Sequence, residues 1–179
     1  RRQRQMCIRD STQAGHDLLN SIEKSNKTTI ALTTGITYGG GLEFALSCDY
    51  RIGSKKTEFR FPETGIGIYP GLGGTQRMSR MVGVEIARWA ILAGNRIDGA
   101  LSKQLGIIDE YSSETELENT VLKGLEKSGT KFRGKPIEIT EKIDTIMRFY
   151  GDNALTEILS GRTPVGVVAE DRHQNQLVL

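Results

Sequence analysis

Glycine is concentrated between Thr34 and Thr75, and this concentration constrains the fold more than any other feature of the sequence. Ten of the chain's 21 glycines fall in this stretch, at Gly35, Gly39, Gly40, Gly41, Gly53, Gly65, Gly67, Gly71, Gly73 and Gly74. Glycine loses more backbone entropy than other residues when it becomes ordered. A dense set at turns therefore indicates unusual backbone angles, or a ligand that comes close to backbone N–H groups.

Short apolar runs alternate with helical apolar stripes around these turns, which predicts a mixed α/β fold. Helices are predicted over 12–24, 42–49, 75–83, 84–94, 99–106, 139–149 and 154–159. Further helices are predicted to follow a capping box at Ser113 and Glu116, and to begin at Thr163. Strands are predicted over 28–33, 50–53, 57–61 and 107–108. Asp98 is the expected N-cap of the helix over 99–106.

With 179 residues the chain has the length of one domain, in which we expect three segments. Residues 1–11 are predicted to be a non-native or disordered leader, because the first ten carry four arginines and show no apolar periodicity. Residues 12–130 form the predicted core, and 131–179 a C-terminal helical region. The basic, glycine-containing stretch over 128–136 is the expected linker between them.

Composition excludes several classes of function. The 24 basic and 22 acidic residues nearly balance, which argues against a nucleic-acid binder. No apolar run reaches the roughly 20 residues of a bilayer span, and two cysteines make no disulfide framework, so we expect a soluble cytoplasmic protein without a membrane partner. No cluster has metal-ligand spacing, and the GLGGT turn lacks the lysine of a phosphate-binding P-loop.

Two glutamates of this stretch follow turns and have apolar neighbours. Glu43 follows the glycine triplet, whereas Glu63 follows Pro62, which fixes its own backbone angle and places Glu63 at a bend. Two buried carboxylates in different environments can divide the roles of acid and base. The alternative for Glu43 is that it only complements the dipole of its helix. At the start of the same helix, the backbone N–H of Gly40 can donate to an oxyanion.

Three runs between Lys27 and Tyr111 resemble the enoyl-CoA hydratase/isomerase (crotonase) superfamily in order and spacing. These runs are GITYGGGLEFALSCDYRIGS, FRFPETGIGIYPGLGGTQRMSRMVG and AILAGNRIDGALSKQLGIIDE. The resemblance implies a crotonase-like spiral of ββα units followed by C-terminal helices, assembled as a homotrimer or hexamer. It also implies an acyl-CoA thioester substrate and no separate cofactor, since coenzyme A is part of that substrate.

The resemblance extends to single residues. It implies that Gly40 donates its N–H to the thioester oxygen in an oxyanion hole, with Gly39 beside it in contact with the substrate. It implies that Glu43 activates the water added at Cβ, and that Glu63 exchanges the proton at Cα or shares that water. Gly71 corresponds to a residue whose backbone lies against the acyl group. The family's first oxyanion donor lies upstream of the triplet, on sequence that we expect this chain to lack, so full activity is not expected of it.

Hydration of a 2-enoyl-CoA is the leading hypothesis, and three alternatives stay open. The segment from Lys131 resembles the 3-hydroxyisobutyryl-CoA hydrolase branch, which indicates a thioester hydrolase, although that branch typically lacks a glutamate at position 43. An enoyl-CoA isomerase and a non-catalytic acyl-CoA-binding or assembly subunit are the others. Arg77, Arg80 and Arg88 are interpreted as a solvated face, with contacts to coenzyme A phosphates as the alternative.

Overall fold

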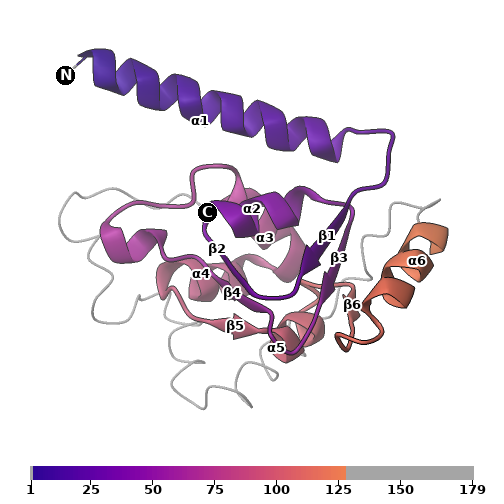
Figure 1. Ribbon diagram of the computed structural model, residues 1–179. Helices are drawn as coiled ribbons and strands as arrows, with labels where there is room; N and C mark the ends of the chain where they lie inside the picture. The colour runs from indigo at the N-terminus through magenta and orange to yellow at the C-terminus, as the bar shows by residue number, and fades with distance from the viewer. Residues whose placement is uncertain (1, 128–179) are drawn as a thin grey trace.

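The computed structural model describes the backbone of residues 2–127 and the side chains of residues 9–126, so the linker and helices predicted beyond them lie outside the described residues. Figure 1 shows a mixed α/β arrangement, as predicted. In chain order its elements are α1 (Arg2–Glu23), β1 (Ile30–Thr33), β2 (Ile36–Tyr38), α2 (Gly40–Ser47), β3 (Tyr50–Gly53), β4 (Glu58–Arg60), η1 (Glu63–Ile66), α3 (Gly74–Val82), α4 (Val84–Leu92), β5 (Ile97–Asp98), α5 (Gly99–Gln104), β6 (Glu110–Tyr111) and α6 (Leu117–Lys127).

The described strands form two three-stranded sheets, in the orders β1-β3-β6 and β2-β4-β5. Parallel pairs dominate: β1 pairs with β3 so that Ile30 lies opposite Tyr50, and β2 pairs with β4 so that Ile36 lies opposite Glu58. Only β4 and β5 run antiparallel among these strands. Because α2 connects the β1–β2 segment to β3, the glycine triplet lies where the chain leaves β2 and turns into a helix.

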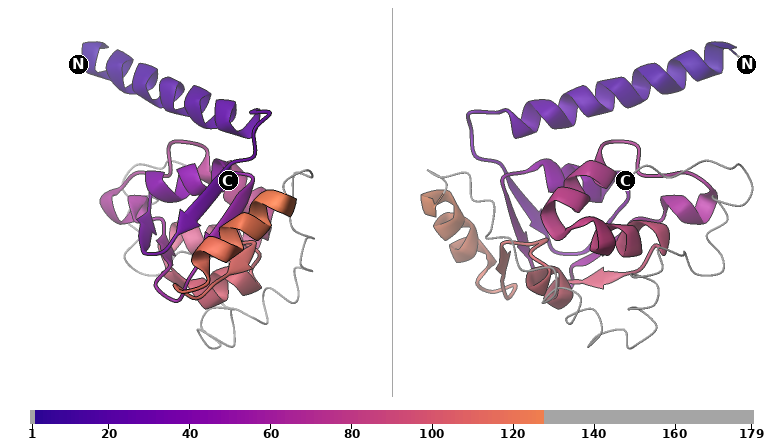
Figure 2. Two further views of the ribbon diagram at one scale, coloured as in Figure 1. Left: turned by 45° about the vertical axis from the view of Figure 1, so that its right-hand side comes forward. Right: turned by 180° about the vertical axis from the view of Figure 1, so that it is seen from behind.

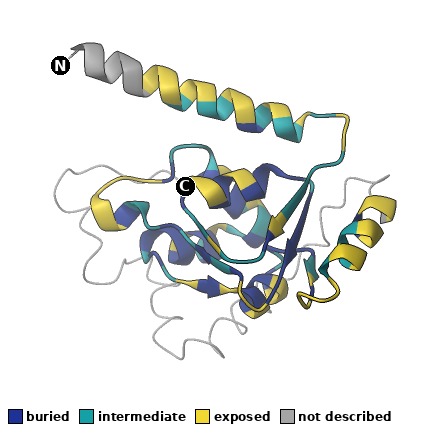
Figure 3. Ribbon diagram, in the orientation of Figure 1, coloured by how far each residue is buried: buried dark blue, intermediate teal, exposed yellow. Residues whose placement is uncertain are grey.

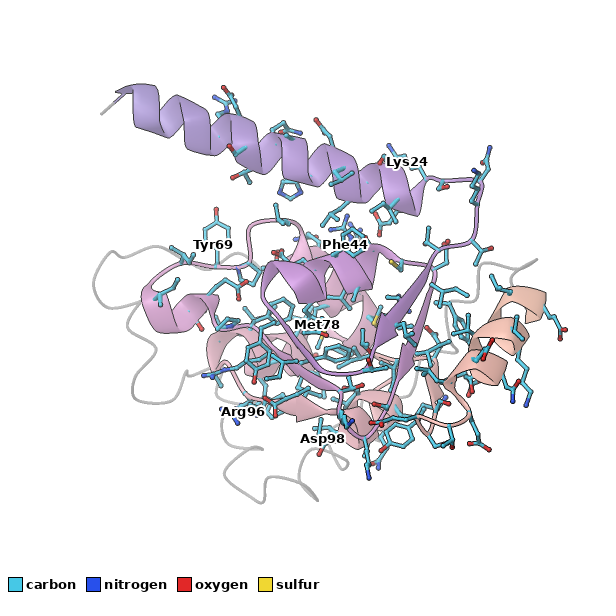
Figure 4. The ribbon with its side chains drawn as sticks, in the orientation of Figure 1. Lys24, Phe44, Tyr69, Met78, Arg96 and Asp98 are labelled. Carbon is cyan, nitrogen blue, oxygen red and sulfur yellow. The ribbon has the colours of Figure 1, made fainter. Side chains whose placement is uncertain are left out.

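The core lies between the helices and the sheets, and Figure 3 shows its buried residues in the interior of the body. Helix α4 contributes to this core, and its buried residues are Ile86, Ala87, Trp89, Ala90, Ile91 and Leu92. Helices α3 and α4 meet at Gly83, whose φ of 91° lets it end one helix and begin the next. Met78 of α3, labelled in the middle of the body in Figure 4, extends this core toward the glycine turns.

Helix α1 is longer than the sequence predicts. It begins at Arg2 and not at Thr12, and Figures 1 and 2 show it as one continuous rod along one side of the body. Arginine, glutamine and methionine are good helix formers, which explains why the helix extends toward the N-terminus beyond the residues with apolar periodicity. The described part of residues 1–11 is therefore helical here, while the division of the chain into three segments stays a prediction.

The strand predicted over 107–108 is wrong. Both isoleucines there are buried in the core, and their N–H groups donate to the Ser102 carbonyl at 2.8 and 3.2 Å, which closes the end of α5. The strand, β6, forms instead two residues later at Glu110–Tyr111. Strands β2 and β5 were not predicted, because runs of three and two residues are too short to show a periodicity of two.

Candidate active site

Glu43 is held at the start of α2 by backbone groups from a turn far along the chain. Its side chain is buried, at 2% exposure, and its Oε1 accepts hydrogen bonds from the N–H groups of Leu72 and Gly74, each at 2.7 Å. Two N–H donors on one carboxylate oxygen fix the orientation of the side chain. Glu43 is therefore a fixed, oriented carboxylate and not simply a charge that complements a helix dipole.

The geometry of the second turn requires glycine at two positions, for different reasons. Gly73 has a φ of +92°, the left-handed conformation that favours glycine, and it forms the N-cap of α3. At Gly74 a Cβ would lie 2.7 Å from Cγ of Glu43 and 2.9 Å from the Phe61 ring. Only a glycine lets the backbone approach Glu43 closely enough to donate. The clustering of glycine in the sequence thus has a physical cause at this turn.

Glu63 has a different environment. It begins the 3-10 helix η1, directly after Pro62, so the predicted bend is a short helical turn. Its Oε2 is buried and has no hydrogen-bond partner among the described residues, while its Oε1 faces Gly39, where a Cβ would lie only 2.7 Å away. Burial raises the pKa of Glu63 above its usual value, and the negative charge of nearby Glu43 raises that pKa further.

In the first glycine turn, one backbone N–H is already hydrogen-bonded and, within the described residues, the next is free to bind an acceptor. The Gly39 N–H donates to the Arg60 carbonyl at 3.0 Å, and its φ of 53° again favours glycine. Helix α2 begins at the next residue, Gly40, which is exposed and whose N–H has no acceptor among the described residues. Because the first N–H groups of a helix lack partners within it, Gly40 offers a donor at the positive end of α2.

The predicted site residues come together unevenly. Four of them lie around the start of α2, namely Gly39, Gly40, Glu43 and Glu63. Glu63 reaches Gly39, and Leu72, whose N–H binds Glu43, has its side chain 3.6 Å from the position of a Gly40 Cβ. Gly71 immediately precedes the turn that binds Glu43, but it makes no hydrogen bond to either glutamate within residues 2–127. The structure thus places these residues, while their catalytic and substrate-binding roles stay predictions.

Arg77 is a residue of this site that the sequence did not reveal. The interpretation of Arg77, Arg80 and Arg88 as a solvated face is wrong for Arg77, because its side chain is only 7% exposed. It bonds to the glycine turn and to α1, whereas Arg80 and Arg88 are exposed. The helical spacing of α3 places Arg77 beside the buried Met78, but a charged residue next to an apolar one carries no distinctive signal.

The cysteine and histidine residues are not among the predicted site residues. Cys48 is buried, and burial raises the pKa of its thiol, which makes it a poorer nucleophile. His16 lies on α1, while His173 lies outside the described residues. No three potential metal ligands gather in the described part of the chain. Among the same residues, no helix has the length and apolar character needed to cross a bilayer.

Comparison with known proteins gives a consistent result. Residues 2–161 match the family described as enoyl-CoA hydratase/isomerase. The short-chain-enoyl-CoA hydratase of Clostridium acetobutylicum is 40% identical over 106 residues, which cover 59% of this chain and 41% of that protein. The crotonyl-CoA hydratase of Syntrophomonas wolfei is 35% identical over 112 residues, covering 63% of this chain and 43% of the relative.

A solved structure agrees with the sequence comparison. The crystal structure of an enoyl-CoA hydratase from Bacillus anthracis superposes with a TM-score of 0.65 at 26% identity, covering 87% of this chain and 62% of the other. This similarity supports the crotonase-like fold that the sequence predicts. The chain spans about two fifths of the length of the two curated relatives.

Proposed function

Since this chain belongs to the enoyl-CoA hydratase/isomerase family, we propose that the protein adds water across the double bond of a 2-enoyl-CoA. One observation supports this most directly. Two carboxyl groups share one site in different surroundings: Oε1 of Glu43 accepts two backbone N–H groups, whereas Glu63 has a buried oxygen without a partner among the described residues and a raised pKa. Such a difference separates a base from an acid.

The proposed reaction begins with the thioester carbonyl. The Gly40 N–H donates to its oxygen and stabilises the negative charge that develops there as the enolate forms. Gly39 and Gly71 are assigned to the walls beside the substrate. No separate cofactor takes part in this proposal, because coenzyme A enters and leaves as part of the substrate.

The two glutamates then divide the elements of water. Both backbone hydrogen bonds of Glu43 go to Oε1, so we assign the water to Oε2. Glu43 takes one proton from this water as the oxygen bonds to Cβ, and Glu63 gives its proton to Cα as the enolate collapses to the thioester. Transfer of a proton from Glu43 to Glu63 through solvent restores the starting state, so that the net change is addition of one water.

The test is hydration of a short 2-enoyl-CoA by the full-length protein, followed through the loss of the conjugated thioester's absorbance. We expect Glu63→Gln to lower kcat by roughly 10²- to 10⁴-fold, the range for loss of a general acid or base. Glu118→Gln, an exposed glutamate of α6, is the matched control and should leave kcat unchanged. Unchanged hydration by Glu63→Gln would exclude the proposal.

The same variants separate the alternatives. A double-bond isomerase needs Glu63 to move a proton but needs no activated water. Glu43→Gln would therefore spare isomerisation of a 3-enoyl-CoA, whereas in a hydratase it would lower kcat for hydration by roughly 10²- to 10⁴-fold. A thioester hydrolase would release free thiol from a 3-hydroxyacyl-CoA. A non-catalytic subunit would assemble without turning over any of these substrates. The proposed homotrimer or hexamer is checked by the mass of the full-length protein in light scattering.

A further inference from the structure

We propose that Arg77 is a positioning residue for Glu43, and that helix α1 contributes to the site through the contacts it makes with Arg77. The kinetic part of this inference rests on the proposed function. It follows from a continuous set of contacts that runs from α1 through the Arg77 guanidinium to the Leu72–Gly74 turn, and from that turn to the Glu43 carboxylate.

The first link joins Arg77 to α1. Its Nε lies 3.2 Å from Oε1 of Glu23, and its Nη2 lies 3.3 Å from Oε2 of the same carboxylate and 3.1 Å from the Asn20 amide oxygen. A guanidinium that holds a carboxylate with two nitrogens is fixed in its plane as well as in its position. Because the Arg77 side chain is 7% exposed and that of Glu23 is 31% exposed, solvent screens this pair only in part.

The second link joins Arg77 to the turn. Its Nη1 donates to the Leu72 carbonyl at 2.7 Å, and its own backbone N–H donates to the Gly73 carbonyl at 3.0 Å. One residue thus holds two successive carbonyls of the turn. The approach is close, since a Cβ on Gly73 would lie 2.5 Å from Nη1 of Arg77.

The third link is the one to the carboxylate. The turn whose carbonyls Arg77 holds is the turn whose N–H groups, on Leu72 and Gly74, bind Oε1 of Glu43. Rotating the Leu72 carbonyl away from Arg77 would change the backbone angles of the turn and misdirect these N–H groups. Arg77 therefore acts on the reaction through Glu43, without touching the substrate itself.

The kinetic test compares Arg77→Lys with Gln76→Ala in the full-length protein. Lysine keeps the charge but cannot span Glu23 and the Leu72 carbonyl with a planar fork. We expect kcat to fall roughly 10- to 100-fold, the range for a small misplacement of a catalytic group, with KM changed much less. Gln76→Ala, on an exposed position of the same helix, should leave both constants unchanged.

A double-mutant cycle separates positioning from general destabilisation. If Arg77 acts through Glu43, Arg77→Lys should lower kcat strongly in the native background and hardly at all in a Glu43→Gln background. Equal fold-losses in both backgrounds would overturn the proposal. Glu23→Gln, which keeps the shape of the partner and removes its charge, should show the same dependence on Glu43, and it replaces Arg77→Lys in the cycle if that variant does not fold.

A second measurement does not depend on activity. Amide hydrogen exchange at Leu72 and Gly74 reports whether their N–H groups stay bonded to Glu43. Arg77→Lys should speed exchange at these two amides at least tenfold relative to the amides of α4. If the native protein hydrates no enoyl-CoA but this exchange increases, the positioning role stands and the proposed function falls. If the native protein is active and exchange at these amides stays unchanged, the positioning role falls.

Discussion

The N–H of Gly74 lies 2.7 Å from Oε1 of Glu43, a contact between residues 31 positions apart in the sequence. Gly74 is the first residue of α3, and Glu43 lies in the first turn of α2. Two helix N-termini therefore meet at one carboxylate. Since the N-terminal end of each helix carries partial positive charge, the Glu43 side chain lies between two helix ends of the same polarity.

Gly74→Ala should disrupt this contact. The added Cβ would lie 2.7 Å from Cγ of Glu43 and 2.9 Å from the Phe61 ring, so the glutamate must move. We expect a loss of about 1–3 kcal/mol in the free energy of unfolding, as for other overpacked sites, together with a large fall in kcat. Urea unfolding measures the first effect. Gly35→Ala is the control, because its Cβ would meet nothing within 4 Å, and equal losses in the two variants would contradict this explanation.

Glu63→Gln should stabilise the protein at neutral pH. Folding raises the pKa of Glu63 above 4.5, so the folded state holds this proton more tightly than the unfolded chain. The resulting stability is present below pH 4.5 and is lost as the pH rises through the raised pKa. A neutral glutamine does not incur this loss. The melting temperature of the variant should therefore exceed that of the native protein at pH 7, and the difference should shrink on acidification.

Melting curves from pH 4 to pH 8 check this, with Glu118→Gln as an exposed control. A difference for Glu63→Gln that stays constant over this range would show that the ionisation of Glu63 does not contribute to it.

Asp109→Ala should be among the most destabilising substitutions away from the site. The Asp109 carboxylate accepts the Arg51 backbone N–H at 2.7 Å and lies 3.0 Å from Nη2 of Arg51, in a pair that is almost fully buried. Removing one partner leaves a buried guanidinium uncompensated, which costs about 3–5 kcal/mol. Chemical unfolding measures this loss. Lys56→Ala, which removes an exposed ion pair with Glu114, should have little effect, and a comparable effect would contradict the role of burial.

Asp98→Ala should weaken α5. The Asp98 carboxylate accepts the Leu101 N–H at 2.8 Å, the arrangement of an N-cap. Its loss should cost about 0.5–2 kcal/mol, while Asp98→Asn, which also accepts this hydrogen bond, should cost less. Figure 4 places Asp98 on the side of the body away from α1, so kcat of the folded variant should be unchanged. A fall in kcat at full folding would show that α5 influences the site.

Sequence reasoning found the elements that have local signals. Gly83 between α3 and α4, Asp98 before α5 and the apolar run of β3 each mark their structure within a few residues. The capping box is partly confirmed: Ser113 bonds to the Glu116 carboxylate at 2.8 Å, and α6 begins after it, at Leu117. Strands β2 and β5 had no such signal, because neighbouring strands define them.

The residues of the candidate site also differ in whether the local sequence identifies them. Glu43, Glu63 and the glycine turns stand out locally, since acidic residues beside turns in an apolar stretch are unusual. Arg77 does not stand out, because its partners on α1 lie 54 and 57 residues away along the chain. Its burial depends on a packing of α1 against the glycine turn that no window of sequence describes.

These long sequence separations also set when the site can form. The contacts that fix Glu43 and Arg77 join segments 29 to 57 residues apart, so closing them costs chain entropy that local helices do not incur. The oriented carboxylate exists only once α1, α2 and α3 have docked. Correct alignment of Glu43 therefore reports that folding is complete.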